Sequence, residues 1–147
     1  MKWLTVVSGL VAFAAGAAAS VPPDLTGPEW TLTAIDGVAP LGEPPPSIAF
    51  TMTPAPDAKG AALSGYSGCN RFFGAYNLAP GAKISIEVRG MTKMACEGPR
   101  MELERSFVAA LGRMTYLEWR YDRTMTMVSE DGKTRLDFKQ PPLEPAN

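Results

Sequence analysis

The feature that most restricts the fold is a series of short segments in which apolar and polar residues alternate. Ile84, Ile86 and Val88 alternate with polar residues, which is the pattern of a strand with one buried face. Further strands of this kind are expected at 29–34, 48–52, 61–67, 116–121, 124–129 and 134–139. Turn signals such as Asp131-Gly132 separate them. The pattern therefore predicts about seven or eight short strands in an antiparallel sheet.

One segment, from Pro99 to Met114, has helical spacing instead. Its apolar stripe consists of Leu103, Phe107, Ala110, Leu111 and Met114. Arg100 and Glu104 are four residues apart, a spacing that suits an ion pair on a helix. We expect this helix to pack against Trp30, Ile84, Ile86 or Trp119 of the sheet. The fold class that follows is α+β, a curved antiparallel sheet curling toward a small barrel with one helix packed across it.

The first twenty residues resemble a secretory signal peptide. Lys2 precedes an uncharged, mostly apolar stretch from Trp3 to Ala19, and small residues follow. A retained membrane anchor is the alternative, although alanine and glycine dominate the second half of the stretch. We expect cleavage after Ala19 or Ser20, no stable membrane anchor afterwards, and a periplasmic or secreted protein. The expected organisation is a signal peptide at 1–20, a lead-in at 21–28, the domain at 29–139 and a flexible tail at 140–147.

Composition excludes several classes of function. The 147-residue chain has no histidine, so neither a Ser-His nor a Cys-His catalytic pair can form. Its 14 basic and 15 acidic residues leave no basic surplus for nucleic acid, and nucleotide or flavin fingerprints are absent. Carboxylates such as Glu87 and Glu118 could act as a hydrolytic pair, but the acidic residues are expected to be solvated. We therefore expect no catalytic residues, no cofactor and no enzymatic activity.

The chain contains two cysteines, Cys69 and Cys96. A reactive thiol at Cys69 is one hypothesis, and a disulfide between the two residues is the other. Export and the even cysteine count favour the disulfide. It would tie a glycine-rich segment to the entrance of the helix and stabilise the fold by about 3–4 kcal/mol through loop-closure entropy.

Two binding hypotheses stay open. Thioether and thiolate ligands from Met91, Met94 and Cys96 could hold Cu(I), with Met125 and Met127 as additional ligands, although methionine also fills cores. The aromatic residues Phe72, Phe73 and Tyr76 could instead line a pocket for an apolar molecule, because strands that close can surround a small cavity.

The order of these motifs resembles a known family. They are Ser64-Gly65, Ser67-Gly68-Cys69-Asn70-Arg71-Phe72-Phe73-Gly74, Tyr76, Met91-Thr92, Met94-Ala95-Cys96, and the helix with Phe107 and Leu111. Together with Trp30 and Phe138 near the two ends, this order resembles the META domain family of HslJ-like heat-shock proteins. The resemblance implies an α+β half-barrel and an envelope or secreted domain with no established enzymatic activity.

The resemblance also implies structural roles for the family's motif residues and supplies no catalytic residues, and we expect no metal site. These residues are Gly68, Cys69, Asn70, Arg71, Phe72, Gly74, Met91, Thr92, Met94 and Cys96. Gly65 and Gly68 are expected to adopt backbone conformations closed to other residues. The expected function is a binding module that supports stress or antibiotic tolerance through an envelope protein or an apolar small molecule. The alternatives are a protease-inhibitor-like domain that presents the 38–47 loop, and a copper binder.

Overall fold

A computed structural model of the chain describes residues 25–57 and 59–141. The expected signal peptide and the last six residues of the expected tail lie outside the described residues. The described elements are β1 (Trp30–Ile35), β2 (Ser47–Pro54), β3 (Ala61–Tyr66), β4 (Arg71–Ala79), β5 (Lys83–Met91), α1 (Gly98–Leu111), β6 (Met114–Trp119), β7 (Thr124–Ser129) and β8 (Arg135–Lys139).

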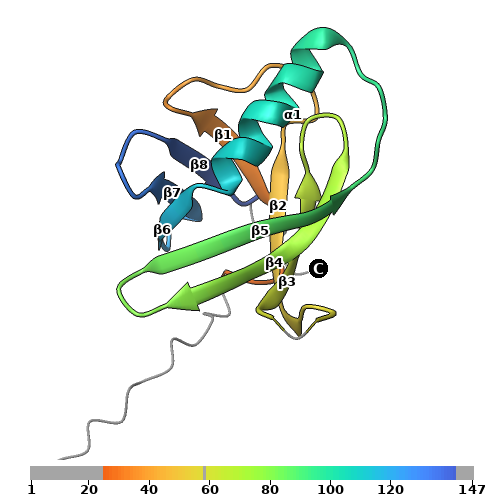
Figure 1. Cartoon of the computed structure of the whole chain (residues 1–147). Coiled ribbons are helices and arrows are strands. Elements are labelled where there is room, and N and C mark those ends of the chain that lie inside the picture. The colour runs from red at the N-terminus through yellow and green to blue at the C-terminus, as the bar shows by residue number, and fades with distance from the viewer. Residues whose placement is uncertain (1–24, 58, 142–147) are drawn as a thin grey trace, which may run out of the picture.

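The sheet is a closed antiparallel barrel with its strands in sequence order (Figure 1). The prediction of an antiparallel sheet with one helix is confirmed, whereas the half-barrel is corrected. Closure results from the pairing of the first strand with the last, with Leu32 opposite Phe138. The alternating pattern shows which residues face inward. Whether the two end strands meet depends on the twist and stagger accumulated over the whole sheet, which the pattern does not contain.

Strand pairing is least extensive between β5 and β6, the two strands that α1 separates in the sequence. Lys83 pairs with Tyr116, and the Leu117 amide donates to the Ala82 carbonyl at 2.8 Å. From the end of β5 the chain crosses the barrel as α1 before it returns as β6 (Figure 1). The ring of Phe107 on α1 lies 6.0 Å from Phe72 and 6.2 Å from Phe138, between centroids. Ala110 and Leu111 of α1 belong to the same buried cluster, so the helix packs on the barrel core through these three side chains.

Large side chains fill the interior of the barrel. The largest fully buried ones are Trp30, Tyr76, Phe50, Phe107 and Phe138, and Leu111, Ile84 and Ile86 belong to the same cluster. This confirms the expected packing of Phe107 and Leu111 against sheet residues. Phe50 and Tyr76 meet edge to face at 4.9 Å, and the Tyr76 hydroxyl donates to the Thr51 carbonyl at 2.7 Å.

The structure differs from the predictions in three places. The helix ends at Leu111 rather than Met114, which is buried at the start of β6. Strand β4 spans Arg71–Ala79, a segment that is not among the expected strands, and the chain turns at Pro80 to Ala82. In the lead-in, Leu25 is fully buried and its carbonyl accepts a hydrogen bond from the Trp30 indole at 3.0 Å. Tertiary contacts therefore extended the core beyond what local pattern indicated.

Candidate functional site

The expected disulfide between Cys69 and Cys96 is present, with their Cα atoms 6.0 Å apart. It joins the turn between β3 and β4 to the segment that precedes α1. A structural disulfide fits an oxidising compartment outside the cytoplasm, in agreement with the expected export. Within residues 25–57 and 59–141, no helix has the length and hydropathy needed to cross a membrane.

Beside the disulfide, the buried residue Asn70 organises a set of hydrogen bonds. Its side-chain oxygen accepts from the Met94 amide at 2.6 Å and from the Thr92 hydroxyl at 2.9 Å. Its side-chain nitrogen donates to Glu104 at 3.1 Å, and its main-chain amide donates to the same carboxylate at 2.9 Å. The Ser67 hydroxyl also donates to Glu104. We call these five residues the staple network.

The burial of Glu104 corrects the prediction that acidic residues are solvated. Glu104 is almost completely buried, and three donors from Ser67 and Asn70 compensate for its desolvation. The sequence did contain a signal, because Glu104 lies three residues before Phe107 and seven before Leu111, on the apolar face of the helix.

The expected ion pair between Arg100 and Glu104 is not among the contacts of the described residues. Arg100 donates instead to the Gly68 carbonyl at 3.0 Å and to the Tyr66 hydroxyl at 2.5 Å. Both side chains of the expected pair thus reach from the helix to the β3–β4 turn, at different points.

Three motif glycines have different roles. Gly68 has a φ of 101°, as expected, and Leu103, only half-buried, packs against it. Gly65, however, lies in a strand without a positive φ, where a Cβ would approach the Ser47 carbonyl oxygen to 2.2 Å. At Gly74 a Cβ would lie 1.9 Å from the Glu87 carbonyl oxygen. Gly65 and Gly74 are therefore needed for close approach of strands rather than for unusual dihedral angles.

The aromatic residues of the motif do not share a pocket. Phe72 and Tyr76 are buried in the core, whereas Phe73 is 58% exposed and its ring covers Gly90 on the outside of β5. Met91 pairs with Phe72 and packs partly against the core. The expected pocket between the three aromatic rings is therefore not formed.

A surface cleft of about 500 Å³ adjoins the disulfide, and we call it the staple cleft. One row of outward-facing residues runs across it on four neighbouring strands. Thr31 is opposite Ser47, Ser47 is opposite Tyr66, and Tyr66 is opposite Arg71. The other lining residues are Glu29, Pro44, Pro45, Cys69, Thr92, Met94, Cys96 and Arg100. The family motif thus supplies part of a concave surface in addition to the disulfide.

Charge in the staple cleft is distributed unevenly. Arg100 is held by Tyr66 and Gly68, and Glu29 accepts a hydrogen bond from Ser47. Arg71 is exposed, and its guanidinium has no hydrogen bond or ion pair to any residue in the described part of the chain. Two arginines against one carboxylate give the cleft a net positive charge.

A second concave surface lies between the loop after β1 and the start of α1, with a volume of about 730 Å³. Val38 and Leu41 on the loop are 70% and 74% exposed. This loop forms the first part of the 38–47 segment expected to suit a protease inhibitor. Two apolar side chains are thus displayed beside the helix.

The other candidate residues lie apart from the staple cleft. Glu87 and Glu118 are exposed, and each pairs with an arginine two residues later, Arg89 at 3.3 Å and Arg120 at 3.1 Å. Neither carboxylate lines the cleft. The hydrolytic-pair hypothesis therefore gains no support from the positions of these two residues.

The copper hypothesis loses the ligand on which it depended. The sulfur of Cys96 is bonded to Cys69, and Met125 and Met127 are buried in the core. Among residues 25–57 and 59–141, no group of three or more histidine, cysteine or acidic residues could hold a metal ion.

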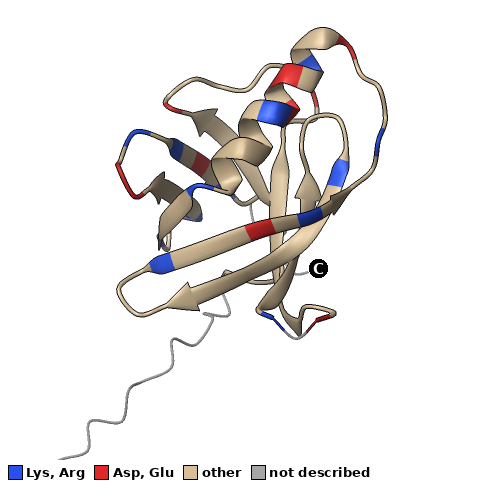
Figure 2. Cartoon of the chain, in the orientation of Figure 1, with Lys and Arg blue, Asp and Glu red and all other residues tan. Residues whose placement is uncertain are grey.

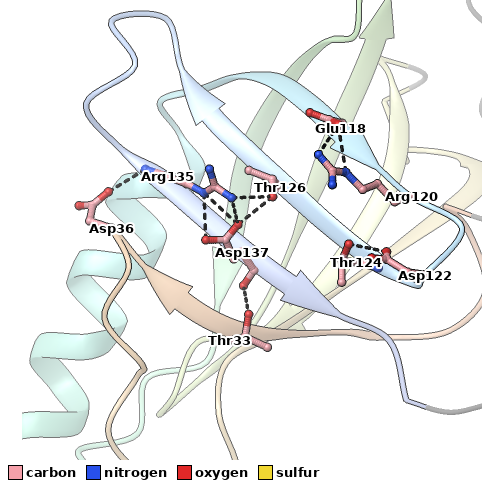
Figure 3. A network of polar contacts seen from close by, with 9 residues as sticks. All are labelled: Thr33, Asp36, Glu118, Arg120, Asp122, Thr124, Thr126, Arg135 and Asp137. Carbon is pink, nitrogen blue, oxygen red and sulfur yellow. Dashed lines mark hydrogen bonds and ion pairs between the residues drawn. The ribbon is translucent and has the colours of Figure 1, made fainter.

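The outer face of β1 and β6–β8 carries an exposed set of polar contacts (Figure 3). Arg135 pairs with Asp137 at 2.9 Å, and Thr126 donates to Asp137 at 2.7 Å. Thr33 donates to the Asp137 carbonyl at 3.0 Å. Partial burial raises the pKa of Asp137, but the hydrogen bonds from Arg135 and Thr126 outweigh it and leave the pKa below its ordinary value. We call Thr126, Arg135 and Asp137 the outer-face network.

Comparison with known proteins agrees with this architecture. The META domain family matches residues 23–142. The NMR structure of a protein from Burkholderia xenovorans has a TM-score of 0.60 and 26% identity, covering 89% of this chain and 99% of that chain. A crystal structure of a DUF4847 family protein from Bacteroides vulgatus has a TM-score of 0.59 at 12% identity, covering 82% of this chain and 96% of that chain, and shows the fold alone. No curated protein gives a significant match. Because the family match spans most of the chain, the chain belongs to the META domain family.

Proposed function

We propose that this protein is an exported, non-catalytic binding module that supports stress or antibiotic tolerance, and that its binding site is the staple cleft. The observation that carries the proposal is that motif residues line a concave surface, where the guanidinium of Arg71 has no hydrogen-bond or ion-pair partner among the described residues. Small-ligand sites have volumes of about 300–1,000 Å³ and combine apolar walls with a few polar groups. The cleft, at about 500 Å³, has that size and composition.

The disulfide and the staple network support this assignment. Both hold one wall of the cleft against the β3–β4 turn, so the lining residues keep their positions before a ligand arrives. A preformed site loses less conformational entropy on binding than a mobile one does. The ligand is a partner protein of the envelope or a small molecule with apolar surface.

The test is to fill the staple cleft with a bulky side chain. We expect Thr31→Trp to abolish capture of a stoichiometric ligand from envelope extract, as read by native mass spectrometry of the eluate. Thr53→Trp is the matched control, because Thr53 is exposed on β2 and does not line the cleft. Equal capture by both variants would rule out the staple cleft as the site.

Export and the absence of catalysis are parts of the same proposal. Intact mass of the protein isolated from the envelope should lack residues 1–19 or 1–20, and a mass that includes Met1 would contradict export. Glu87→Gln and Glu118→Gln should leave stress tolerance unchanged, because the proposed role requires no acid or base. Loss of tolerance in either folded variant would favour a hydrolase.

The exposed side chains of Val38 and Leu41 favour a second candidate, a domain that inhibits a protease by inserting this loop. In that case Leu41→Ala would weaken inhibition of a co-purified protease, whereas Thr31→Trp would not. Variants of the loop and of the staple cleft therefore distinguish the two candidate functions.

A further inference from the structure

Arg71 combines a fixed main chain with a free side chain. Its amide donates to the Thr92 hydroxyl at 3.1 Å, and its carbonyl accepts from the Thr92 amide at 3.0 Å. Its guanidinium, by contrast, has no protein partner within residues 25–57 and 59–141. Arg89, Arg120 and Arg135 each pair with a nearby carboxylate. A guanidinium on a fixed main chain, with no carboxylate partner among the described residues, is suited to a carboxylate supplied by a ligand.

Tyr66 provides a second donor beside Arg71. The two residues are direct cross-strand neighbours, so their Cβ atoms lie about 5 Å apart. The Tyr66 hydroxyl accepts a hydrogen bond from the Arg100 guanidinium at 2.5 Å. Because a phenol that accepts from a cation retains its own proton to donate, Tyr66 and Arg71 can both donate to one acceptor in the cleft. Arginine matches a carboxylate through two parallel hydrogen bonds.

The remaining groups of the staple cleft select the rest of the ligand. Pro44, Pro45, Met94 and the disulfide form apolar walls. Glu29 contributes a negative charge, which opposes a doubly charged phosphate more strongly than a singly charged carboxylate. The site therefore combines recognition of a single negative charge with contact to an apolar group.

We infer that the staple cleft binds a carboxylate attached to an apolar group. The inference rests on the proposed binding function and specifies its ligand chemistry. Three sources carry this chemistry: the C-terminus of a peptide, an acidic side chain within a peptide, and a fatty acid. Arg71 and Tyr66 hold the carboxylate, and the proline, methionine and disulfide walls contact the apolar part.

Titration of the oxidised protein, followed by NMR and calorimetry, tests the inference with probes for each source. The probes are N-acetyl-Leu-Phe as the free acid, the same dipeptide as its amide, capped Leu-Glu-Phe amide, and decanoate. At least one carboxylate probe should shift the main-chain amide signals of Tyr66, Arg71 and Thr92. If the free acid binds, its amide should bind about tenfold more weakly, because it lacks the charge-assisted hydrogen bonds. Which probe binds most tightly identifies the source.

Two matched arginine variants test whether Arg71 supplies the charge that binds the carboxylate. Arg71→Gln should weaken binding of the carboxylate probe about tenfold. Arg105 is an exposed residue of α1 outside the cleft, so Arg105→Gln should leave binding unchanged. Glu29→Gln should tighten binding, because it removes the opposing charge. Thermal unfolding of each variant controls for folding, and Arg71→Gln should fold normally because it removes no side-chain hydrogen bond or ion pair to another described residue.

The inference is overturned if no carboxylate probe binds, if the amide binds as well as the acid, or if Arg71→Gln binds as well as the unaltered protein. Failure of the proposed function has a different signature. Ligand capture that Thr31→Trp abolishes, together with absent carboxylate binding, would leave the binding module standing and reject only this ligand class. Capture that is insensitive to Thr31→Trp would reject the site itself.

Discussion

The staple network and the outer-face network are similar in chemistry and opposite in burial. Each contains a carboxylate that accepts hydrogen bonds from a hydroxyl and from nitrogen donors. Glu104 is almost completely buried, whereas the side chains of Arg135 and Asp137 are 57% and 25% exposed. The comparison teaches that solvent access, more than the number of hydrogen bonds, decides how much a polar network contributes to stability.

The physical reason is whether water can replace the hydrogen bonds that a substitution removes. If the Asn70 side chain is removed, the almost completely buried carboxylate of Glu104 loses one of its donors, and an unsatisfied buried group costs about 1–3 kcal/mol. If Arg135 is removed, water hydrates Asp137 at little cost, since exposed ion pairs contribute about 0–1 kcal/mol. Acidic and basic residues are interspersed over the rest of the surface, as Figure 2 shows. Most of these charges resemble the outer-face network.

The largest effect is expected from the disulfide that adjoins the staple network. Replacing Cys69 and Cys96 together by alanine should lower the free energy of unfolding by about 3–4 kcal/mol, from the loop-closure entropy of a 27-residue separation. Urea denaturation of the oxidised protein and the double variant measures it. Hydrogen exchange should rise first around Asn70 and Met94, and uniform acceleration would show that the staple is not a local unit.

The next largest effect belongs to the staple network itself. Asn70→Ala should cost about 1–3 kcal/mol, because it removes a donor to the buried carboxylate of Glu104. A double-mutant cycle of Asn70→Ala with Glu104→Ala should give a coupling energy above about 1 kcal/mol. An equally large coupling energy between Arg135→Ala and Asp137→Ala would contradict the expected difference between the two networks.

A small effect is expected in the outer-face network. Arg135→Ala should change the free energy of unfolding by about 0.5 kcal/mol, and the change should shrink at 1 M salt because exposed charges are screened. Denaturation at low and high salt checks this. A loss above about 2 kcal/mol would show that this face is shielded from solvent.

The smallest effect is the dependence of the outer-face network on pH. The pKa of Asp137 lies below its ordinary value in the folded protein, so its ionised form favours folding. This stabilisation is present above the unfolded pKa of about 3.9 and is lost as pH falls through the lower, folded pKa. The free energies of unfolding of Asp137→Asn and of the unaltered protein should therefore differ at pH 7 and converge as the pH falls below the folded pKa of Asp137. A difference that persists at lower pH would point to a steric effect of the substitution.

Local pattern was sufficient for much of this molecule. Alternation located β5, β7 and β8 to within two residues, because one face of each strand is buried and the other is solvated. Cysteine count and the export signal favoured the disulfide, which is present. Helical spacing located α1 but placed its end three residues late, because Met114 continues the apolar pattern while belonging to the next strand.

Only the tertiary structure decided the barrel and the cleft. Closure of β8 onto β1 requires twist and stagger summed over eight strands, and no short segment encodes that sum. The row of Thr31, Ser47, Tyr66 and Arg71 draws one residue from each of four strands, so its members are adjacent only through strand register. The sequence determined which residue types this protein has available for chemistry and which positions face inward. The register, a property of pairing between distant segments, decided which of them meet.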